Sequence, residues 1–360
     1  MPNSDGMQVP RAKTHGRRNN RRAKPTDLIA ALDLGTNNCR LLVAAIEGGD
    51  FRVIDSFSRV TKLGGGVAER HSLSDEAMER TLAALRICAQ KITRHGVADI
   101  KAVATEACRR ASNSNEFVQR IFKETGLVIE TISPQREAEL AFNGCTPLIK
   151  ELGSTAMPAD RVLVFDIGGG STEIAWTKRY DWYDDNRLAT ANDLAIHSIP
   201  YGVLNLSEQF AIGEISRDGF RQSVDLIDQA LSRFDHCDDI ARCIADGRVQ
   251  MVGTSGTVTT LAGIHKNLVR YVRHQIDGTY LRFDDIERLS VEISAMDPAT
   301  RAQNQCIGVD RADLIVAGCA ILLAICRRWP VGHLCVGDRG LREGLLFELL
   351  AERRLRDIRN

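Results

Sequence analysis

One local pattern occurs twice in the chain, and it constrains the fold more than any other feature. An apolar segment at 28–32 ends at Asp33, a short turn follows, and a second apolar segment covers 40–46. The same order returns around Asp166, 133 residues later, with apolar segments at 161–165 and 172–176. Short apolar runs bounded by turn residues predict buried strands. The repetition therefore predicts a duplicated fold in which each half opens with a strand–turn–strand unit.

The segments between the two copies predict alternating strands and helices. A third strand is expected at 51–60, and a helix between Ser74, a capping residue, and Gly96. Apolar residues recur on one face of that helix: Met78, Leu82, Leu85, Ala89 and Ile92. The next segments are expected as strand, helix, strand and helix at 100–104, 116–125, 127–132 and from Ser133 onward. The first half therefore follows the order βββαβαβα.

The sequence pattern of the second half predicts a similar set of strands and helices. Strands are expected at 193–200, 249–252 and 334–336, before a final helix from about Gly340. The predicted fold class is α/β, with two duplicated mixed sheets that carry helices on both faces and enclose a cleft. We expect a basic tail, a first lobe and a second lobe at 1–26, 27–142 and 143–340. The helix at about 341–355 is expected to pack back on the first lobe.

Charge and cysteine content narrow the class of protein. The first 24 residues hold seven Arg or Lys against one Asp, although the whole chain balances 47 basic with 47 acidic residues. Such a tail, without an apolar run, predicts solvated disorder, and it can also contact polyanions. The longest apolar run, 314–326, is too short to cross a bilayer, and the ten cysteines lack metal-site spacing. We therefore expect a cytoplasmic protein without a membrane segment.

Three turns rich in glycine and hydroxyl residues predict a phosphate site. They occupy 33–37, 166–172 and 253–257, and the last leads into a helix N-terminus, which favours anions. Such turns expose backbone N–H groups and hydroxyls that suit phosphate oxygens. A single turn of this kind is more often a structural hairpin, but two at corresponding positions and a third favour binding. Arg40 and Arg109 follow strand ends and suit phosphate as bidentate donors.

Three carboxylates are candidates for chemistry on phosphate. Asp166 ends a buried strand, and Glu173 lies seven residues further on, so both suit Mg²⁺ directly or through water. Glu173 is equally compatible with a surface position in its strand. Glu137 lies in the first turn of a predicted helix, where it suits the helix dipole and also a catalytic base. The residue pattern alone leaves both alternatives open.

Five motifs in order make the chain resemble the exopolyphosphatase and guanosine pentaphosphate phosphohydrolase family, within the actin, sugar-kinase and Hsp70-like fold group. The motifs occupy 31–37, 104–111, 165–173, 252–257 and 337–344. The resemblance implies two RNase H-like lobes, a water-positioning base at Glu137, and a catalytic Mg²⁺, replaceable by Mn²⁺, governed by Asp166 and Glu173. It implies phosphate binding by Asp33, Gly35, Thr36, Asn37, Arg40, Arg109, Gly168, Gly169, Gly170, Ser171, Thr172, Ser255 and Gly256.

The resemblance also implies a reaction, in which water attacks the terminal phosphoanhydride of inorganic polyphosphate and releases orthophosphate. Guanosine pentaphosphate, which would give the tetraphosphate, is an alternative substrate because it presents the same terminal group. A phosphotransferase of the sugar-kinase type and a polyphosphate- or alarmone-binding module without turnover are further alternatives. The family pattern is also compatible with a homodimer.

The sequence departs from the family pattern in three places. Arg136 precedes Glu137 where two adjacent glutamates are common, so one carboxylate is replaced by a cation. The first turn has Thr36, Asn37 and Asn38 in place of Ser-Asn-Ser, which keeps a hydroxyl and an amide. Some relatives carry a long C-terminal helical domain beyond the point where this sequence ends. From that difference we expect a less processive enzyme that favours short or medium chains.

Overall fold

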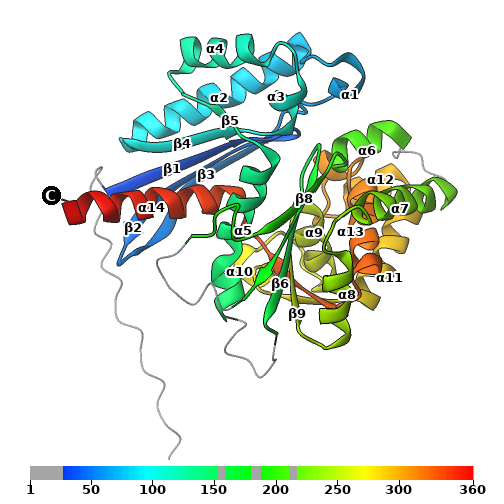
Figure 1. Ribbon diagram of the computed structural model, residues 1–360. Coiled ribbons are helices and arrows are strands. Elements are labelled where there is room, and N and C mark those ends of the chain that lie inside the picture. The colour runs from blue at the N-terminus through cyan, green and yellow to red at the C-terminus, as the bar shows by residue number, and fades with distance from the viewer. Residues whose placement is uncertain (1–26, 152–158, 180–187, 211–216, 360) are drawn as a thin grey trace, which may run out of the picture.

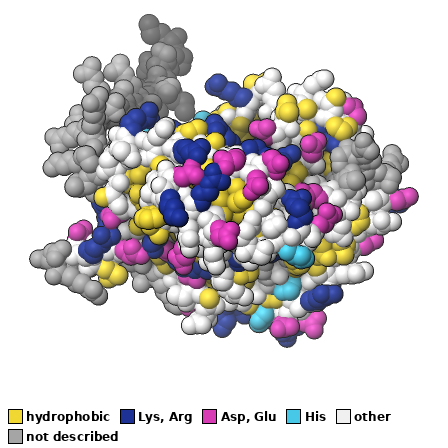
Figure 2. Space-filling view, turned by 90° about the horizontal axis from the view of Figure 1, so that it is seen from above, with side chains coloured by type: hydrophobic (Ala, Val, Ile, Leu, Met, Phe, Trp, Pro, Cys, Tyr) yellow, Lys and Arg dark blue, Asp and Glu magenta, His cyan; other side chains and the backbone are white. Residues whose placement is uncertain are grey.

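The computed structural model describes residues 27–151, 159–179, 188–210 and 217–359, which form two lobes (Figure 1). The basic tail at 1–26 lies outside the described residues. On the face shown in Figure 2, basic and acidic side chains are interspersed, in keeping with the balanced charge of the chain. In the described part of the chain, no helix is both long enough and apolar enough to cross a membrane.

The first lobe is built on a five-stranded sheet in the order β3-β2-β1-β4-β5. Its strands are β1 (Leu28–Leu34), β2 (Asn38–Glu47), β3 (Asp50–Val60), β4 (Asp99–Ala104) and β5 (Glu130–Thr131). Side chains alternate along β1, so Ala30 and Leu32 pack toward α2 (Asp75–His95) and α4 (Ser114–Thr125). Ile29 and Ala31 pack toward α14 (Leu341–Arg359). Helices therefore cover both faces.

The second lobe is built on a six-stranded sheet in the order β10-β11-β9-β6-β7-β8. Its strands are β6 (Arg161–Ile167), β7 (Thr172–Lys178), β8 (Ala195–Ile199), β9 (Val249–Thr254), β10 (Tyr280–Arg282) and β11 (His333–Gly337). One face packs on the helices α7 (Arg217–Leu231), α9 (Gly256–His265), α11 (Phe283–Ala295) and α13 (Ile315–Arg328). The other face packs on α5 (Pro134–Glu151).

Strand pairing confirms the duplication predicted from the two aspartate turns. β1 pairs antiparallel with β2 and parallel with β4, while β6 pairs antiparallel with β7 and parallel with β9. Asp33 and Asp166 occupy the same position in the two sheets, near the ends of β1 and β6. β10 is an addition of the second lobe, because it pairs antiparallel with the outer side of β11.

Local signals predicted most element boundaries closely, and one strand was predicted too long. α2 begins after Ser74, whose side chain accepts from the Ala77 N–H, and ends at Gly96 in the left-handed conformation. The strand expected at 127–132 is reduced to Glu130–Thr131, because only two residues pair with β4 at the sheet edge. The buried residues just before it pack into the core without strand pairing. The remaining described helices are α1 (Val67–Arg70), α3 (Glu106–Arg110), α6 (Val203–Phe210), α8 (Cys237–Ala245), α10 (Arg273–Ile276), α12 (Pro298–Gln303) and the 3-10 turn Val309–Arg311.

Two helices, α5 and α14, connect the lobes and cross each other at glycines (Figure 1). A Cβ on Gly144 would lie 2.0 Å from the Gly340 carbonyl oxygen, and one on Gly344 would lie 2.1 Å from that of Leu140. Real Cβ atoms do not approach backbone this closely, so only glycine permits the crossing. The contact fixes α5, at Leu140 and Gly144, against the first turn of α14.

Candidate active site

A cleft of about 570 Å³ lies where the first strands of the two lobes end. It brings together most of the site residues predicted from the sequence, from segments far apart in the chain. Those that line it are Asp33, Gly35, Thr36, Asn37, Arg40, Glu137, Asp166, Gly168, Gly169, Gly170, Ser171, Ser255 and Gly256. Arg109, Thr172 and Glu173 are not part of the lining. Thr172 is buried, and its hydroxyl donates to the Tyr201 carbonyl at 2.8 Å.

The second lobe contains a glycine turn at 168–170. Groups of α6 hold this turn by donating hydrogen bonds to its carbonyl oxygens. The N–H groups of Val203 and Leu204 donate to the carbonyls of Gly168 and Gly169 at 3.0 and 2.7 Å. The Asn205 amide donates to the Gly170 carbonyl at 2.8 Å. In a trans peptide the N–H points away from the carbonyl, and the turn contains no cis bond. The N–H groups that follow these carbonyls therefore point away from α6, as an anion site requires.

Close packing between Gly202 and this turn supports the same arrangement. A Cβ on Gly202 would lie 2.4 Å from the backbone of both Gly169 and Gly170. The Gly202 N–H donates to the Asn205 side-chain oxygen at 2.7 Å, so Asn205 joins the two backbone segments. Neither Gly202 nor Asn205 was predicted from the sequence, because their role depends on how α6 packs against the turn.

The equivalent turn in the first lobe uses its hydroxyl internally. The Thr36 hydroxyl donates to the buried carboxylate of Glu106 at 3.3 Å and accepts from the Ala107 N–H at 3.2 Å. A threonine hydroxyl has a single proton, which is thus directed at Glu106. The Gly35 N–H donates to the Asn38 carbonyl at 2.9 Å, just as Gly168 donates to Ser171. In this arrangement the first turn can offer a ligand its other backbone N–H groups.

The third turn places a helix N-terminus at the cleft. Ser255 is the N-cap of α9, and its oxygen accepts from the Val258 N–H at 2.9 Å. Because the oxygen accepts in this bond, the hydroxyl proton is left to donate. Ser255 and Gly256 both line the cleft. The hydroxyl and the positive end of the helix dipole therefore favour an anion at this position.

Glu137 is a buried carboxylate at the start of α5. The Ser133 hydroxyl accepts from the Arg136 N–H at 3.1 Å and caps the helix, which places Glu137 in the first turn. Its side chain accepts from Arg109 at 2.7 Å, and Arg109 also donates to the Ile132 carbonyl at 2.9 Å. Burial raises the pKa of Glu137 to about 7, although the charge of Arg109 opposes the rise. Arg109 thus positions the carboxylate, which lies at the cleft wall.

The strand pair that bears Asp166 differs in charge from its counterpart in the first lobe. Asp33 on β1 is the direct partner of Arg40 on β2, so that pair joins opposite charges. Asp166 on β6 is the direct partner of Glu173 on β7. Partners in an antiparallel sheet carry side chains on the same face, and like charges there are unfavourable. The second lobe therefore holds two acidic side chains where the first holds an acid and a base.

This acidic pair fits a divalent cation. Glu173 is 1% exposed, accepts from the Ser198 hydroxyl at 3.0 Å, and leaves its Oε2 atom without a partner. Burial raises the pKa of Asp166 to about 7, with a further contribution from the charge of Glu137. Among the described residues, no three His, Cys, Asp or Glu side chains gather as a complete metal site. Mg²⁺ commonly takes one or two carboxylates and completes its shell with water and substrate phosphates.

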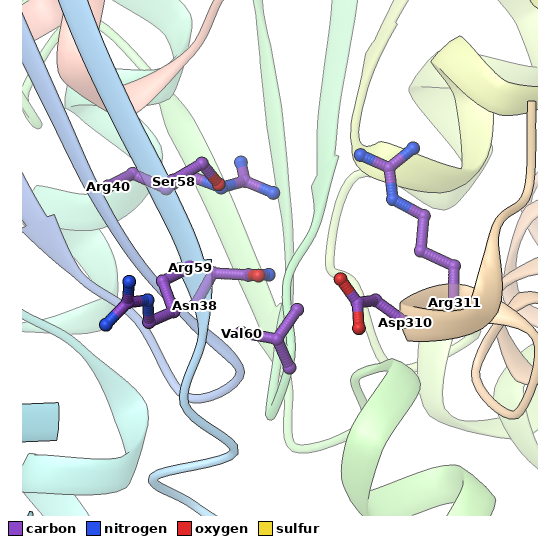
Figure 3. A pocket seen from close by; sticks show the side chains of 7 residues that line it. All are labelled: Asn38, Arg40, Ser58, Arg59, Val60, Asp310 and Arg311. Atoms are coloured by element: carbon purple, nitrogen blue, oxygen red, sulfur yellow. The ribbon is translucent and has the colours of Figure 1, made fainter. Parts of the chain in front are cut away.

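The mouth of the cleft is a smaller pocket of about 370 Å³ (Figure 3). The guanidinium groups of Arg40 and Arg311 extend into the gap from opposite lobes (Figure 3). The Arg311 guanidinium donates to the Thr260 hydroxyl at 3.0 Å. Cleft-lining side chains that were not predicted as site residues include Tyr271, Arg273, Arg311, Arg339 and Arg342. Arginine is common on surfaces, so its presence alone does not distinguish these positions as site residues.

The duplicated sheets and the cleft between their turns define a two-lobed α/β protein of the actin-like, RNase H-like fold class. The model of the Ppx/GppA phosphatase family matches residues 42–353, and the chain belongs to that family. A crystal structure of the Aquifex aeolicus family member is 29% identical and aligns over 91% of this chain and 98% of its own, with a TM-score of 0.69.

Two further solved structures have the same fold. An exopolyphosphatase-like protein is 26% identical, covers 92% of this chain and 100% of its own, and has a TM-score of 0.77. An exopolyphosphatase from Cytophaga hutchinsonii is 24% identical, covers 90% of this chain and 98% of its own, and has a TM-score of 0.75. The family and fold predicted from the five motifs are thus confirmed.

Proposed function

We propose that the protein is an exopolyphosphatase, which hydrolyses the terminal phosphoanhydride of inorganic polyphosphate and releases orthophosphate. The observation that carries the proposal is Glu137, a buried carboxylate at a cleft where turns from both lobes present backbone N–H groups. Membership of the Ppx/GppA phosphatase family supports hydrolysis. The similar structure at 26% identity, which is named an exopolyphosphatase-like protein, supports polyphosphate as the substrate.

In the proposed mechanism, Glu137 orients a water molecule and accepts its proton as the water attacks the terminal phosphorus. The N–H groups of Gly169 and Gly170 and the hydroxyl of Ser255 donate to the phosphate oxygens. In phosphoryl transfer the developing charge is spread over these oxygens, so fixed donors lower the barrier. Arg109 keeps the Glu137 carboxylate in place. The buried position of Glu137 limits competing contact with bulk water.

Asp166 and Glu173 would hold Mg²⁺, or Mn²⁺ in its place, directly or through water. The bound cation would supply positive charge to the phosphate oxygens at the reacting end. The strand pairing of Asp166 with Glu173 and the unpartnered Oε2 atom of Glu173 support this assignment.

The rate of hydrolysis should rise with pH through about 7 and level off above it. Glu137 can accept a proton only when it is ionised, and burial raises its pKa to about 7. Arg109 lowers this pKa, while Asp33 and Glu106 raise it. The rate is to be measured between pH 5 and 9 at saturating Mg²⁺. A profile that stays flat from pH 5 to 8, with chemistry shown to be rate-limiting, would contradict the role of Glu137.

Replacing Asn205 with alanine should lower kcat/KM for polyphosphate by about tenfold, which corresponds to about 1.4 kcal/mol of lost hydrogen bonding. The Asn205 amide connects the Gly170 carbonyl to the Gly202 N–H, so its loss frees the glycine turn. Ser207→Ala is the matched control, because that hydroxyl donates to the Leu204 carbonyl within α6. Equal activity of the two variants would show that Asn205 does not position the turn.

Guanosine pentaphosphate is the second candidate substrate. Tyr271, which is 41% exposed, lines the cleft and offers an aromatic ring to a nucleobase. Hydrolysis of its terminal 5′-phosphate would use the same groups as hydrolysis of polyphosphate.

The experiment that tests the proposal is a side-by-side assay of orthophosphate release from both substrates, at equal concentrations of chain ends. It is run with Mg²⁺, with Mn²⁺ and with EDTA. We expect cation-dependent release with a higher kcat/KM for polyphosphate. A higher value for guanosine pentaphosphate would favour the second candidate. Transfer to an added sugar without release into water would indicate a phosphotransferase, and binding without turnover would indicate a binding module.

A further inference from the structure

Among the described residues, five arginine side chains line the cleft, and some of them are bonded to carboxylates of the protein itself. The five are Arg40, Arg273, Arg311, Arg339 and Arg342. The Arg273 guanidinium donates to Glu343 at 2.7 Å, and Arg339 donates to Asp277 at 2.7 Å. These two guanidinium groups therefore stabilise the connection between β11 and α14. Their charge is neutralised by neighbouring carboxylates.

Arg342 differs from these two arginines because no such bond holds its guanidinium. Among the described residues, its side chain makes no hydrogen bond or ion pair within 4.0 Å. It nevertheless lines the same cleft as Asp33 and Asp166. A partly buried guanidinium without a bonded carboxylate keeps all its donors available for an anion.

The position of Arg342 complements that of Arg40. Arg40 extends from β2 of the first lobe, and Arg342 extends from the second residue of α14. Both side chains line the same cleft. Burial lowers the pKa of Arg342, and the charge of Arg40 lowers it further. Asp33, the strand partner of Arg40, offsets part of the repulsion between these two cations. A ligand with several negative oxygens in the same cleft would offset the rest.

We propose that Arg342 binds the terminal phosphate of the substrate and stabilises the charge that develops there during hydrolysis, opposite Arg40. The inference rests on the proposed hydrolysis of a terminal phosphoanhydride. The planar guanidinium can donate two parallel hydrogen bonds to a phosphate, which fixes its orientation. Arg342 then acts on the reacting end of the chain, and its contribution is greatest in the transition state.

The helix crossing gives Arg342 a fixed position relative to the catalytic base. Glu137 lies in the first turn of α5, and Arg342 lies in the first turn of α14. The glycine contacts at Gly144 and Gly344 bring these two helices into backbone contact. A base and a cation carried on rigid helices in contact are held at a constant separation. The crossing therefore holds Glu137 and Arg342, which line the same cleft, on two helices that are fixed against each other.

The experiment compares Arg342→Gln and Arg342→Lys with the wild type in the full chain, with inorganic tripolyphosphate as the substrate. We expect Arg342→Gln to lower kcat by about 10²-fold, the usual loss for one transition-state donor, with KM changed less than fivefold. Lysine should restore part of the loss, because it keeps the charge without the bidentate geometry. Arg327→Gln is the control, since it removes a charge from an exposed pair with Glu287. It should stay within twofold of the wild type.

Two further measurements separate a chemical role of Arg342 from a structural one. Low millimolar guanidinium should increase the kcat of Arg342→Ala in a saturable manner, which a merely structural side chain would not allow. Calorimetric binding of tripolyphosphate to Glu137→Gln tests the contact without turnover. Adding Arg342→Gln to this variant should weaken the binding at least threefold. Unchanged kcat in Arg342→Gln, or equal binding together with no guanidinium rescue, would overturn the inference. Absence of hydrolysis by the wild type would instead reject the proposed function, while the binding comparison still decides the role of Arg342.

Discussion

Replacing Glu137 with glutamine should lower the turnover of polyphosphate by about 10²–10⁴-fold, the range expected for loss of a general base. Glutamine has nearly the same shape and can still accept the hydrogen bond that Arg109 donates to this side chain. It cannot take a proton from water at neutral pH. Substrate binding should therefore remain while chemistry is lost. Single-turnover orthophosphate release and tripolyphosphate binding measure the two effects separately.

Glu139→Gln is the matched control for this variant. Glu139 lies two residues further along α5, pairs with Arg136 at 2.6 Å, and does not line the cleft. Its replacement should change turnover by less than about threefold, as expected for an ion pair near the surface. The raised pKa of Glu137 also predicts that the wild type loses stability as pH rises from about 4.5 to about 7, because the unfolded chain ionises first. Glu137→Gln should lose less stability than the wild type over that range, because the raised pKa of Asp166 still contributes. Near-normal turnover of the variant would reject Glu137 as the base.

Replacing Asp166 with asparagine should have opposite effects on activity and on the stability of the cation-free protein. Turnover in Mg²⁺ should fall by at least about 10²-fold, because the change removes a carboxylate that would hold the cation. Asp166 and Glu173 are direct strand partners, so the change also removes one of two facing acidic groups. Thermal unfolding in EDTA at pH 8 should therefore occur at a higher temperature in the variant.

The addition of Mg²⁺ distinguishes this account from a simple loss of packing. Mg²⁺ should raise the unfolding temperature of the wild type and have a smaller effect on Asp166→Asn, because a ligand stabilises only the form that binds it. Asp246→Asn is the control, since Asp246 is exposed and forms a long contact of 3.8 Å with Arg248. An equal response of the wild type and Asp166→Asn to Mg²⁺ would contradict the proposed cation site.

Most strands and helices of the fold could be predicted, because interactions between residues close in the sequence determine them. The apolar runs before Asp33 and Asp166 specify buried strands, and Ser74 and Gly96 specify both ends of α2. The duplicated strand order followed from the repeated turns and is confirmed by the pairing of both sheets. The strand expected at 127–132 was too long, since apolar residues at a sheet edge can pack without pairing.

The residues of the site were predictable where a turn or a strand end identifies them, and otherwise they were not. Glycine turns and the Asp166 strand end have local signatures. Asn205 has none, because its role depends on the packing of α6 on a turn. Arg342 lies in the motif at 337–344, but its role was not predicted, because it depends on the crossing of α5 with α14. The interaction of the Thr36 hydroxyl with Glu106 also depends on tertiary contact over 70 positions in the chain. These features required the folded structure.

The most direct test of the central claim is hydrolysis of polyphosphate in water enriched in ¹⁸O, followed by mass analysis of the orthophosphate and of the remaining chain. If water positioned by Glu137 attacks the terminal phosphorus, each orthophosphate released from a chain end carries one oxygen from water. The shortened chain stays unlabelled, and Glu137→Gln releases almost no labelled product. Label in the remaining chain, or unlabelled orthophosphate at the wild-type rate, would contradict hydrolysis at the terminal phosphorus by this site.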